Sequence, residues 1–184
     1  MNWFSRKPTQ EKYVEAAMKV ASNLYLITIP GAEAAPASLN FTYQDSRYRY
    51  FLFCVSTAIT AALVYDDKKH IKPESLISGC LCLVKFVAEE KPMEFFKNRS
   101  VPLDATERAN SFLMANIKEW SIWPALEKKG LHTEAQELIA RMIHQTESSH
   151  QCSAEDLRRL GPLALDINCR LPTMRLAFNQ LAKR

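Results

Sequence analysis

Glycine is scarce in this chain, since only four of the 184 residues are glycine. Because glycine is the residue that most easily adopts left-handed turns, this scarcity argues against an all-β sandwich or barrel. It also argues against a glycine-rich loop around a phosphate, and neither a P-loop nor a Gly-x-Gly-x-x-Gly motif occurs in the sequence. We therefore expect no nucleotide cofactor, and no other cofactor is predicted.

Long apolar runs are missing too. The uncharged stretch 50–65 is shorter than the roughly 20 predominantly apolar residues that a membrane-spanning helix needs, and the N-terminus lacks the apolar segment of a signal peptide. The cysteines number five, which is odd, and three of them lie in apolar runs. Cys80-x-Cys82 has no second pair with which to form a zinc site and is predicted to be two core thiols. These features predict a soluble cytoplasmic protein without a disulfide framework.

The sequence does contain helical periodicity. Apolar residues recur at spacings of three and four, which gives each segment an apolar face. Helices are predicted at 9–28, 47–65, 73–90, 104–129 (kinked or split at Pro124), 133–146, 153–160 and 172–183. Residues 31–40 contain proline and small side chains and are predicted to form a surface loop. The prediction is a mainly α protein, a single irregular bundle of six or seven helices that spans residues 1–184.

The core of this bundle is predicted from two neighbouring apolar helices. Segments 47–65 and 73–90 are joined by a short polar turn, as in an antiparallel helical hairpin, and both are apolar around much of their circumference. We expect this buried hairpin to form the centre of the core. An alternative is left open at 41–52, where residues alternate as in a small β-hairpin, which would make the fold α+β.

Metal-coordinating side chains gather in one part of the sequence. His144, Glu147 and His150 follow one another at spacings of three, and a Glu-x-x-His unit on a helix places two metal ligands on one face. Cys152 could join them around one ion, or could act as a nucleophile beside His150. The three residues are a candidate metal site, with an ordinary polar turn as the alternative.

Positive charge is concentrated at the C-terminal end. Six basic residues and one acid lie within 158–184, although the whole chain carries only +4. Helices at 153–160 and 172–183, separated by a break at Gly161-Pro162, could act as a helix-turn-helix on nucleic acid. The alternative is a solvated helix face with cations near its C-terminus. The candidates for a basic patch are Arg158, Arg159, Arg170 and Arg175.

Several aromatic side chains stand beside breaks in the helical pattern. Aromatic residues at such places are often core anchors, but when they are exposed together they are typical hot spots of a protein interface. The candidates for partner contacts are Trp3, Phe4, Phe95, Phe96 and Trp123.

These observations favour a non-enzymatic protein-protein interaction module, such as an adaptor, inhibitor or regulator that binds a protein partner through a helical face. The first alternative is a nucleic-acid-binding regulator that uses the basic C-terminal segment, 158–184. The second is a metal-dependent helical enzyme. Whether the chain also associates with itself is left open by the sequence.

Overall fold

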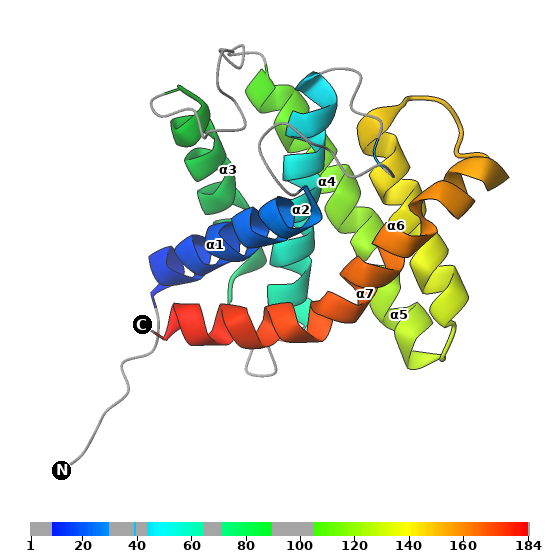
Figure 1. Ribbon diagram of the computed structural model, residues 1–184. Helices are drawn as coiled ribbons and strands as arrows, with labels where there is room; N and C mark the ends of the chain where they lie inside the picture. Colours follow the sequence, from blue (N-terminus) through cyan, green and yellow to red (C-terminus); the bar gives the residue numbers. More distant parts are fainter. Residues whose placement is uncertain (1–8, 30–38, 40–43, 65–70, 90–104, 184) are drawn as a thin grey trace.

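The computed structural model describes residues 9–29, 39, 44–64, 71–89 and 105–183, without the side chains of 44–45, 83–89 and 105–109. In these residues the chain forms seven α-helices and no strand, packed as one bundle (Figure 1). The helices are α1 Gln10–Thr28, α2 Gln44–Val64, α3 Pro73–Glu89, α4 Ala105–Trp120, α5 Trp123–Lys128, α6 His132–Glu147 and α7 Ala154–Ala182. The predicted mainly α bundle is confirmed.

The central element of the bundle is α2. Every residue of 50–62 is buried, and α2 contacts α1, α4, α6 and α7. A helix that is apolar on all sides fits this position because no face of it meets water. The alternative of a β-hairpin at 41–52 is wrong for 44–52, which are helical, and residues 41–43 lie outside the described part.

The second helix of the predicted hairpin, α3, packs mainly against α1 and less against α2. Leu76 and Cys80 are its buried residues among those described up to position 82. Gly79 allows α1 to come close, because a Cβ atom at this position would lie 2.5 Å from Cγ2 of Val14. Of the predicted surface loop at 31–40 only Leu39 is described, and its side chain is buried.

Two glycines within helices are expected to respond in opposite ways to substitution by alanine. At Gly79 the new methyl group collides with Val14, so Gly79→Ala should destabilise the protein by about 1–3 kcal/mol. At Gly161 the nearest atom to a new Cβ is Nε2 of Gln136 at 3.5 Å, an ordinary contact. Gly161→Ala should therefore stabilise the helix by about 0.5–1 kcal/mol. Urea unfolding measures both, and stabilisation by Gly79→Ala would contradict the close approach of α1 and α3.

The end of the helix predicted at 104–129 is correct to within one residue, and Gly130 provides the structural reason. Gly130 has a φ of +71° and lies just beyond the end of α5. The N–H of Gly130 donates to the carbonyl of Glu127, and the N–H of Leu131 donates to that of Leu126, which is the Schellman arrangement. Pro124 lies in the first turn of α5, where its missing N–H costs no hydrogen bond, so the helix predicted at 104–129 is split there.

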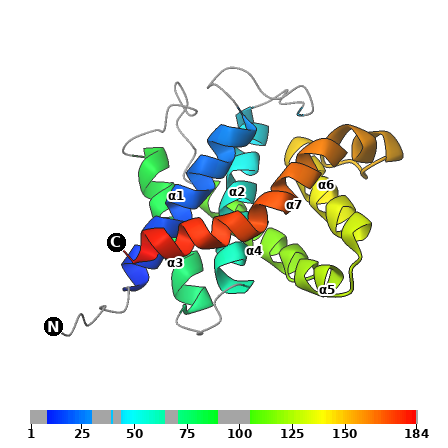
Figure 2. The same cartoon turned by 60° about the horizontal axis from the view of Figure 1, so that its bottom comes forward.

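The C-terminal helix, α7, differs most from the prediction. The predicted break at Gly161-Pro162 and the start of a new helix near Pro172 are both wrong, because one helix runs through both prolines. The predicted helix-turn-helix is therefore absent from 153–183. Figures 1 and 2 show that α7 bends as it passes α6 and then α1.

The continuity of α7 follows from its buried face. A proline inside a helix costs about 3 kcal/mol, because it removes one hydrogen bond and its ring crowds the preceding turn. Both prolines are on the exposed side of α7, whereas the apolar side chains of the opposite side are buried. Each large apolar side chain contributes about 1.5–3 kcal/mol when it is buried, so together they outweigh the two prolines. The buried residues are Leu160, Leu163, Ala164, Ile167, Leu171, Met174, Phe178 and Ala182.

Candidate functional site

The junction between α6 and α7 brings together the polar residues singled out in the sequence. The chain leaves α6 at Glu147 and enters α7 through a capping box at Ser153. Oγ of Ser153 accepts the Asp156 N–H at 3.1 Å, and Oδ2 of Asp156 accepts the Ser153 N–H at 3.0 Å. The hydrogen bonds from Ser153 lower the pKa of Asp156 to about 2, so its carboxylate is ionised at neutral pH.

A partly buried ion pair ties the two helices together beside this cap. Nη1 of Arg159 lies 3.2 Å from Oε1 of Glu147, and Nη2 lies 2.5 Å from Oε2, so the guanidinium donates to both carboxylate oxygens. The Glu147 side chain is only 4% exposed, whereas that of Arg159 is 29% exposed. Arg159 also reaches Oδ1 of Asp156 at 3.4 Å. The guanidinium therefore links the end of α6 to the first turn of α7.

His144 lies in the same junction and is buried. Its Nε2 lies 3.2 Å from the backbone oxygen of His150. Its Nδ1 is buried without a hydrogen-bond partner and lies 3.9 Å from Oδ1 of Asp156. A carbonyl oxygen can only accept, so Nε2 carries the hydrogen and Nδ1 of the neutral ring is an acceptor.

The structure gathers a different set of coordinating groups from the predicted one. Of the predicted metal ligands, Glu147 is held by Arg159, and His150 is exposed and reaches His144 through its backbone carbonyl. The groups that meet are His144, Cys152 and Asp156, whose possible ligand atoms all lie within 4.8 Å of one another. The sequence prediction did not include Asp156, which lies in the first turn of α7 and forms the capping box with Ser153.

Cys152 is half-buried at this junction. Burial, followed by the negative charge of Asp156, raises the pKa of its thiol. A thiol with a raised pKa is largely protonated at neutral pH, which argues against the predicted role as a nucleophile beside His150.

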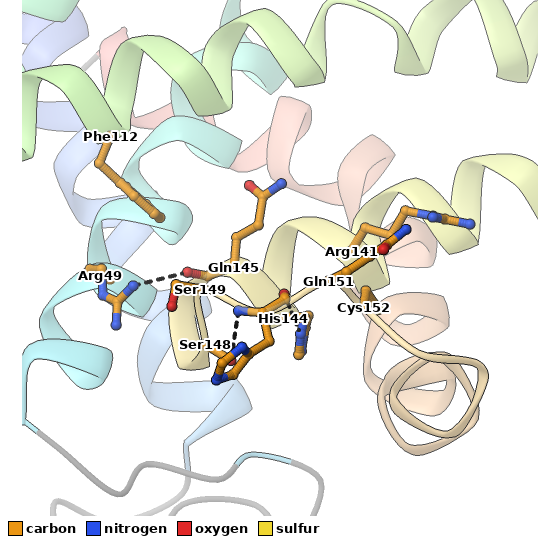
Figure 3. A pocket seen from close by; sticks show the side chains of 10 residues that line it. Arg49, Phe112, Arg141, His144, Gln145, Ser148, Ser149, Gln151 and Cys152 are labelled. Atoms are coloured by element: carbon orange, nitrogen blue, oxygen red, sulfur yellow. Dashed lines mark hydrogen bonds between the residues drawn. The ribbon is translucent and has the colours of Figure 1, made fainter.

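An open hollow of about 560 Å³ borders the junction (Figure 3). His144 and Cys152 line one part of it, and Arg49 from α2 and Phe112 from α4 line another. Nη1 of Arg49 donates to the backbone oxygen of Gln145 at 3.1 Å, which fixes α2 to the end of α6. The hollow is thus built from three helices and the loop between α6 and α7.

The predicted partner-binding aromatics give one correction. Trp123 is only 6% exposed, so it is a core residue and cannot serve as a surface anchor. Its ring meets that of Trp120, and its Nε1 donates to Oδ1 of Asn168 at 2.8 Å, which joins α5 to α7. The other candidates, Trp3, Phe4, Phe95 and Phe96, lie outside the described residues.

The four arginines of the predicted basic patch do not form one patch. Arg159 is paired with Glu147, and Nε of Arg170 lies 2.7 Å from Oδ2 of Asp166. Arg158 and Arg175 are on different sides of α7, because 17 residues at 100° each leave them about 100° apart. Arg159 and Arg170 are thus each balanced by a neighbouring carboxylate.

Only one of the two predicted core thiols lies in the core. Cys80 is buried and Cys82 is exposed, because positions two apart on a helix point to different sides. Cys54 is buried in α2, and burial raises the pKa of its thiol well above the ordinary value.

The exposed side of α7 carries an apolar stripe that the sequence prediction missed. Its members follow one another at spacings of 3, 4, 3 and 4 residues and are all exposed. Leu165 is 49% exposed and Leu176 is 62% exposed, the highest value among the large apolar residues described. We call this set the outer stripe, which consists of Pro162, Leu165, Cys169, Pro172 and Leu176.

Comparisons with known proteins found no match to this chain among family models, curated proteins or solved structures. Among the described residues, none of the helices combines the length and the apolar character needed to span a membrane.

Proposed function

We propose that this protein is a non-enzymatic interaction module that binds an amphipathic helix of a partner protein along the outer stripe of α7. The observation that carries the proposal is the exposure of Leu165 and Leu176, at 49% and 62%, on one side of a long helix. Scattered exposed leucines are normal on protein surfaces, but a periodic row of apolar residues is typical of an interaction face.

The spacing of the outer stripe suits a helix as its partner. Steps of three and four residues place successive side chains along one seam of an α-helix, as at the a and d positions of a coiled coil. The seam extends from Pro162 to Leu176, about four helical turns. A partner helix with its own apolar row could lie along it and cover the exposed leucines.

The charges beside the stripe indicate the chemistry of that partner. Asp166 and Arg170 balance each other near the middle of α7, whereas Lys183 adds positive charge to its C-terminal half. Acidic residues on the flank of the partner helix would complement this half and help to set its direction. Nucleic acid as a partner receives less support, because two of the four candidate arginines are paired with carboxylates.

The test compares two variants with equal changes in charge. Leu165→Asp/Leu176→Asp alters the stripe, and Leu26→Asp/Ile27→Asp alters leucine and isoleucine side chains at the end of α1 that are 51% and 53% exposed. The partner is first identified by affinity purification from the native source with nuclease present. Binding of the purified partner, and of its helix as a peptide, is then measured by calorimetry. We expect one-to-one binding that is at least about 100-fold weaker for the stripe variant and unchanged for the control.

Other outcomes would overturn the proposal in distinguishable ways. Equal binding by the stripe variant would place the interface elsewhere. Co-purifying material that is lost on nuclease treatment would support a nucleic-acid partner. A dimer that dissociates only in the stripe variant would mean that a second copy of the chain covers the stripe. Circular dichroism of both variants checks that α7 remains folded.

A further inference from the structure

His144, Cys152 and Asp156 meet at the start of α7, and their arrangement does not depend on the proposed interaction function. We propose that Nδ1 of His144, Sγ of Cys152 and a carboxylate oxygen of Asp156 bind a divalent ion of the zinc type. The three possible ligand atoms lie within 4.8 Å of one another, and His144 is buried. The site is built from α6, the loop that follows it and the first turn of α7.

The orientation of the His144 ring is the first argument. Its Nε2 lies 3.2 Å from the carbonyl oxygen of His150, and this oxygen can only accept, so the ring hydrogen is on Nε2. In zinc proteins a ligating histidine commonly donates its other ring N–H to a carbonyl or carboxylate, which fixes the ring and exposes the second nitrogen to the metal. The Nδ1 atom of His144 is thus prepared as a ligand.

The surroundings of Nδ1 are the second argument. This atom is buried, has no hydrogen-bond partner and lies 3.9 Å from Oδ1 of Asp156. Nδ1 of the neutral ring and this carboxylate oxygen both carry lone pairs, so a cation placed between them would be attracted to both. A separation of 3.9 Å is too long for a hydrogen bond through a proton on Nδ1. Zinc bonds of about 2.0–2.2 Å to nitrogen and oxygen would separate these two ligands by roughly 3.4 Å at the tetrahedral angle, so this pair would have to move about 0.5 Å closer to bind the ion.

The ligand set also suits zinc chemically. Imidazole, thiolate and carboxylate are its three common protein ligands, and three of them leave a fourth position for water. Harder ions such as Mg²⁺ and Ca²⁺ prefer oxygen ligands alone. Both His144 and Cys152 border the hollow of about 560 Å³, through which an ion can approach from solvent.

The charges at the junction balance when the ion binds. Asp156, Glu147 and Arg159 together carry a net charge of −1. Binding converts the Cys152 thiol to a thiolate and releases its proton to solvent, while the ion adds two positive charges. The cluster is then neutral, which is the least costly state for a partly buried group of charges. Arg159 keeps its two contacts with Glu147, whereas its longer contact of 3.4 Å with Oδ1 of Asp156 would have to be shared with the ion.

The experiment uses Co²⁺ as a spectroscopic substitute for zinc in the full-length, untagged protein, after reduction and treatment with a chelator. A cobalt–thiolate bond gives a charge-transfer absorption in the near ultraviolet, so the spectrum reports directly on the cysteine. We expect saturation at one equivalent of Co²⁺ and displacement of the cobalt by Zn²⁺. Zn²⁺ should also raise the midpoint of thermal unfolding.

The matched variants are Cys152→Ser and Cys169→Ser, which remove one half-buried and one exposed thiol. Cys152→Ser should abolish the charge-transfer band and the thermal shift, whereas Cys169→Ser should keep both. Asp156→Asn should weaken Co²⁺ binding at least about tenfold, because the loss of a group that supports a metal site commonly lowers the metal affinity by about this factor or more. Because serine is close in size to cysteine, Cys152→Ser is expected to fold, and its circular dichroism verifies this. Absence of the band in the wild-type protein, or its survival in Cys152→Ser, would overturn the proposal.

Discussion

Phe53→Ala is expected to lower the free energy of unfolding by about 3–5 kcal/mol, because it leaves a large cavity in the centre of the bundle. Phe53 is fully buried in α2. Its ring centre lies 5.6 Å from that of Tyr50 and 6.0 Å from that of Trp120, so it joins α2 to α4. Urea unfolding followed by circular dichroism measures the change, with the slope of the transition unaltered.

Leu176→Ala is the control for this substitution. Leu176 is 62% exposed, so shortening it should change the free energy of unfolding by no more than about 0.5 kcal/mol. A similar change for the two variants would contradict the position of α2 at the centre of the core. The same pair of measurements also distinguishes a core residue from a residue of the proposed interface, because Leu176→Ala should weaken partner binding and Phe53→Ala should act on stability.

Arg159→Met is expected to destabilise the protein by about 3 kcal/mol, because it removes the guanidinium from a buried carboxylate. The Glu147 side chain is 4% exposed and loses its two hydrogen bonds from Arg159 in this variant. Glu147→Gln should cost only about 1 kcal/mol, because Arg159 is 29% exposed and keeps its contact with Asp156. A larger loss of stability for Arg159→Met than for Glu147→Gln would thus show that Glu147 is the more deeply buried partner. Chemical denaturation of each variant gives the values.

An exposed ion pair on the same helix provides the comparison. Arg170 and Asp166 lie 2.7 Å apart with side chains 38% and 44% exposed, so Arg170→Met should cost at most about 1 kcal/mol. A double-mutant cycle that combines Arg159→Met with Glu147→Gln should yield a coupling energy of about 2 kcal/mol. If Arg159→Met cost no more than Arg170→Met, the ion pair would not hold α6 and α7 together.

Much of the helical framework could be predicted from the sequence, because its signals are local. The spacing of apolar residues placed α1 within one residue of its observed bounds, and α6 as well. The predicted helix end at 129 is followed in the structure by Gly130 with its positive φ, and the helix predicted from 153 begins at the observed capping box of α7. The uncharged stretch 50–65 predicted a buried helix, which α2 confirms over 50–62, where every residue is buried. Each of these signals depends on residues within a few positions of one another.

The errors concern features that depend on distant neighbours. Pro162 and Pro172 are strong local signals for helix ends, but the burial of the opposite side of α7 against α1, α2 and α6 keeps the helix continuous. The regular spacing from Leu165 to Leu176 could not be recognised as one stripe, because the local signals predicted two separate helices in place of α7. Trp123 was named as a candidate for partner contacts for a similar reason, since its contact with Asn168 comes from a residue 45 positions away.

The candidate site, too, combines features that the local sequence determines with features that only the packing of helices determines. The sequence by itself determined that coordinating residues are concentrated between His144 and Cys152, near the junction of two predicted helices. Only the tertiary structure decided their roles, because Arg159 holds Glu147 and the His150 carbonyl fixes the His144 ring. Local sequence encodes backbone hydrogen bonds and apolar periodicity, which act within one helix. The partners of a buried charge or a ring nitrogen depend on how α6 and α7 pack, because the groups that satisfy it come from both helices and the loop between them.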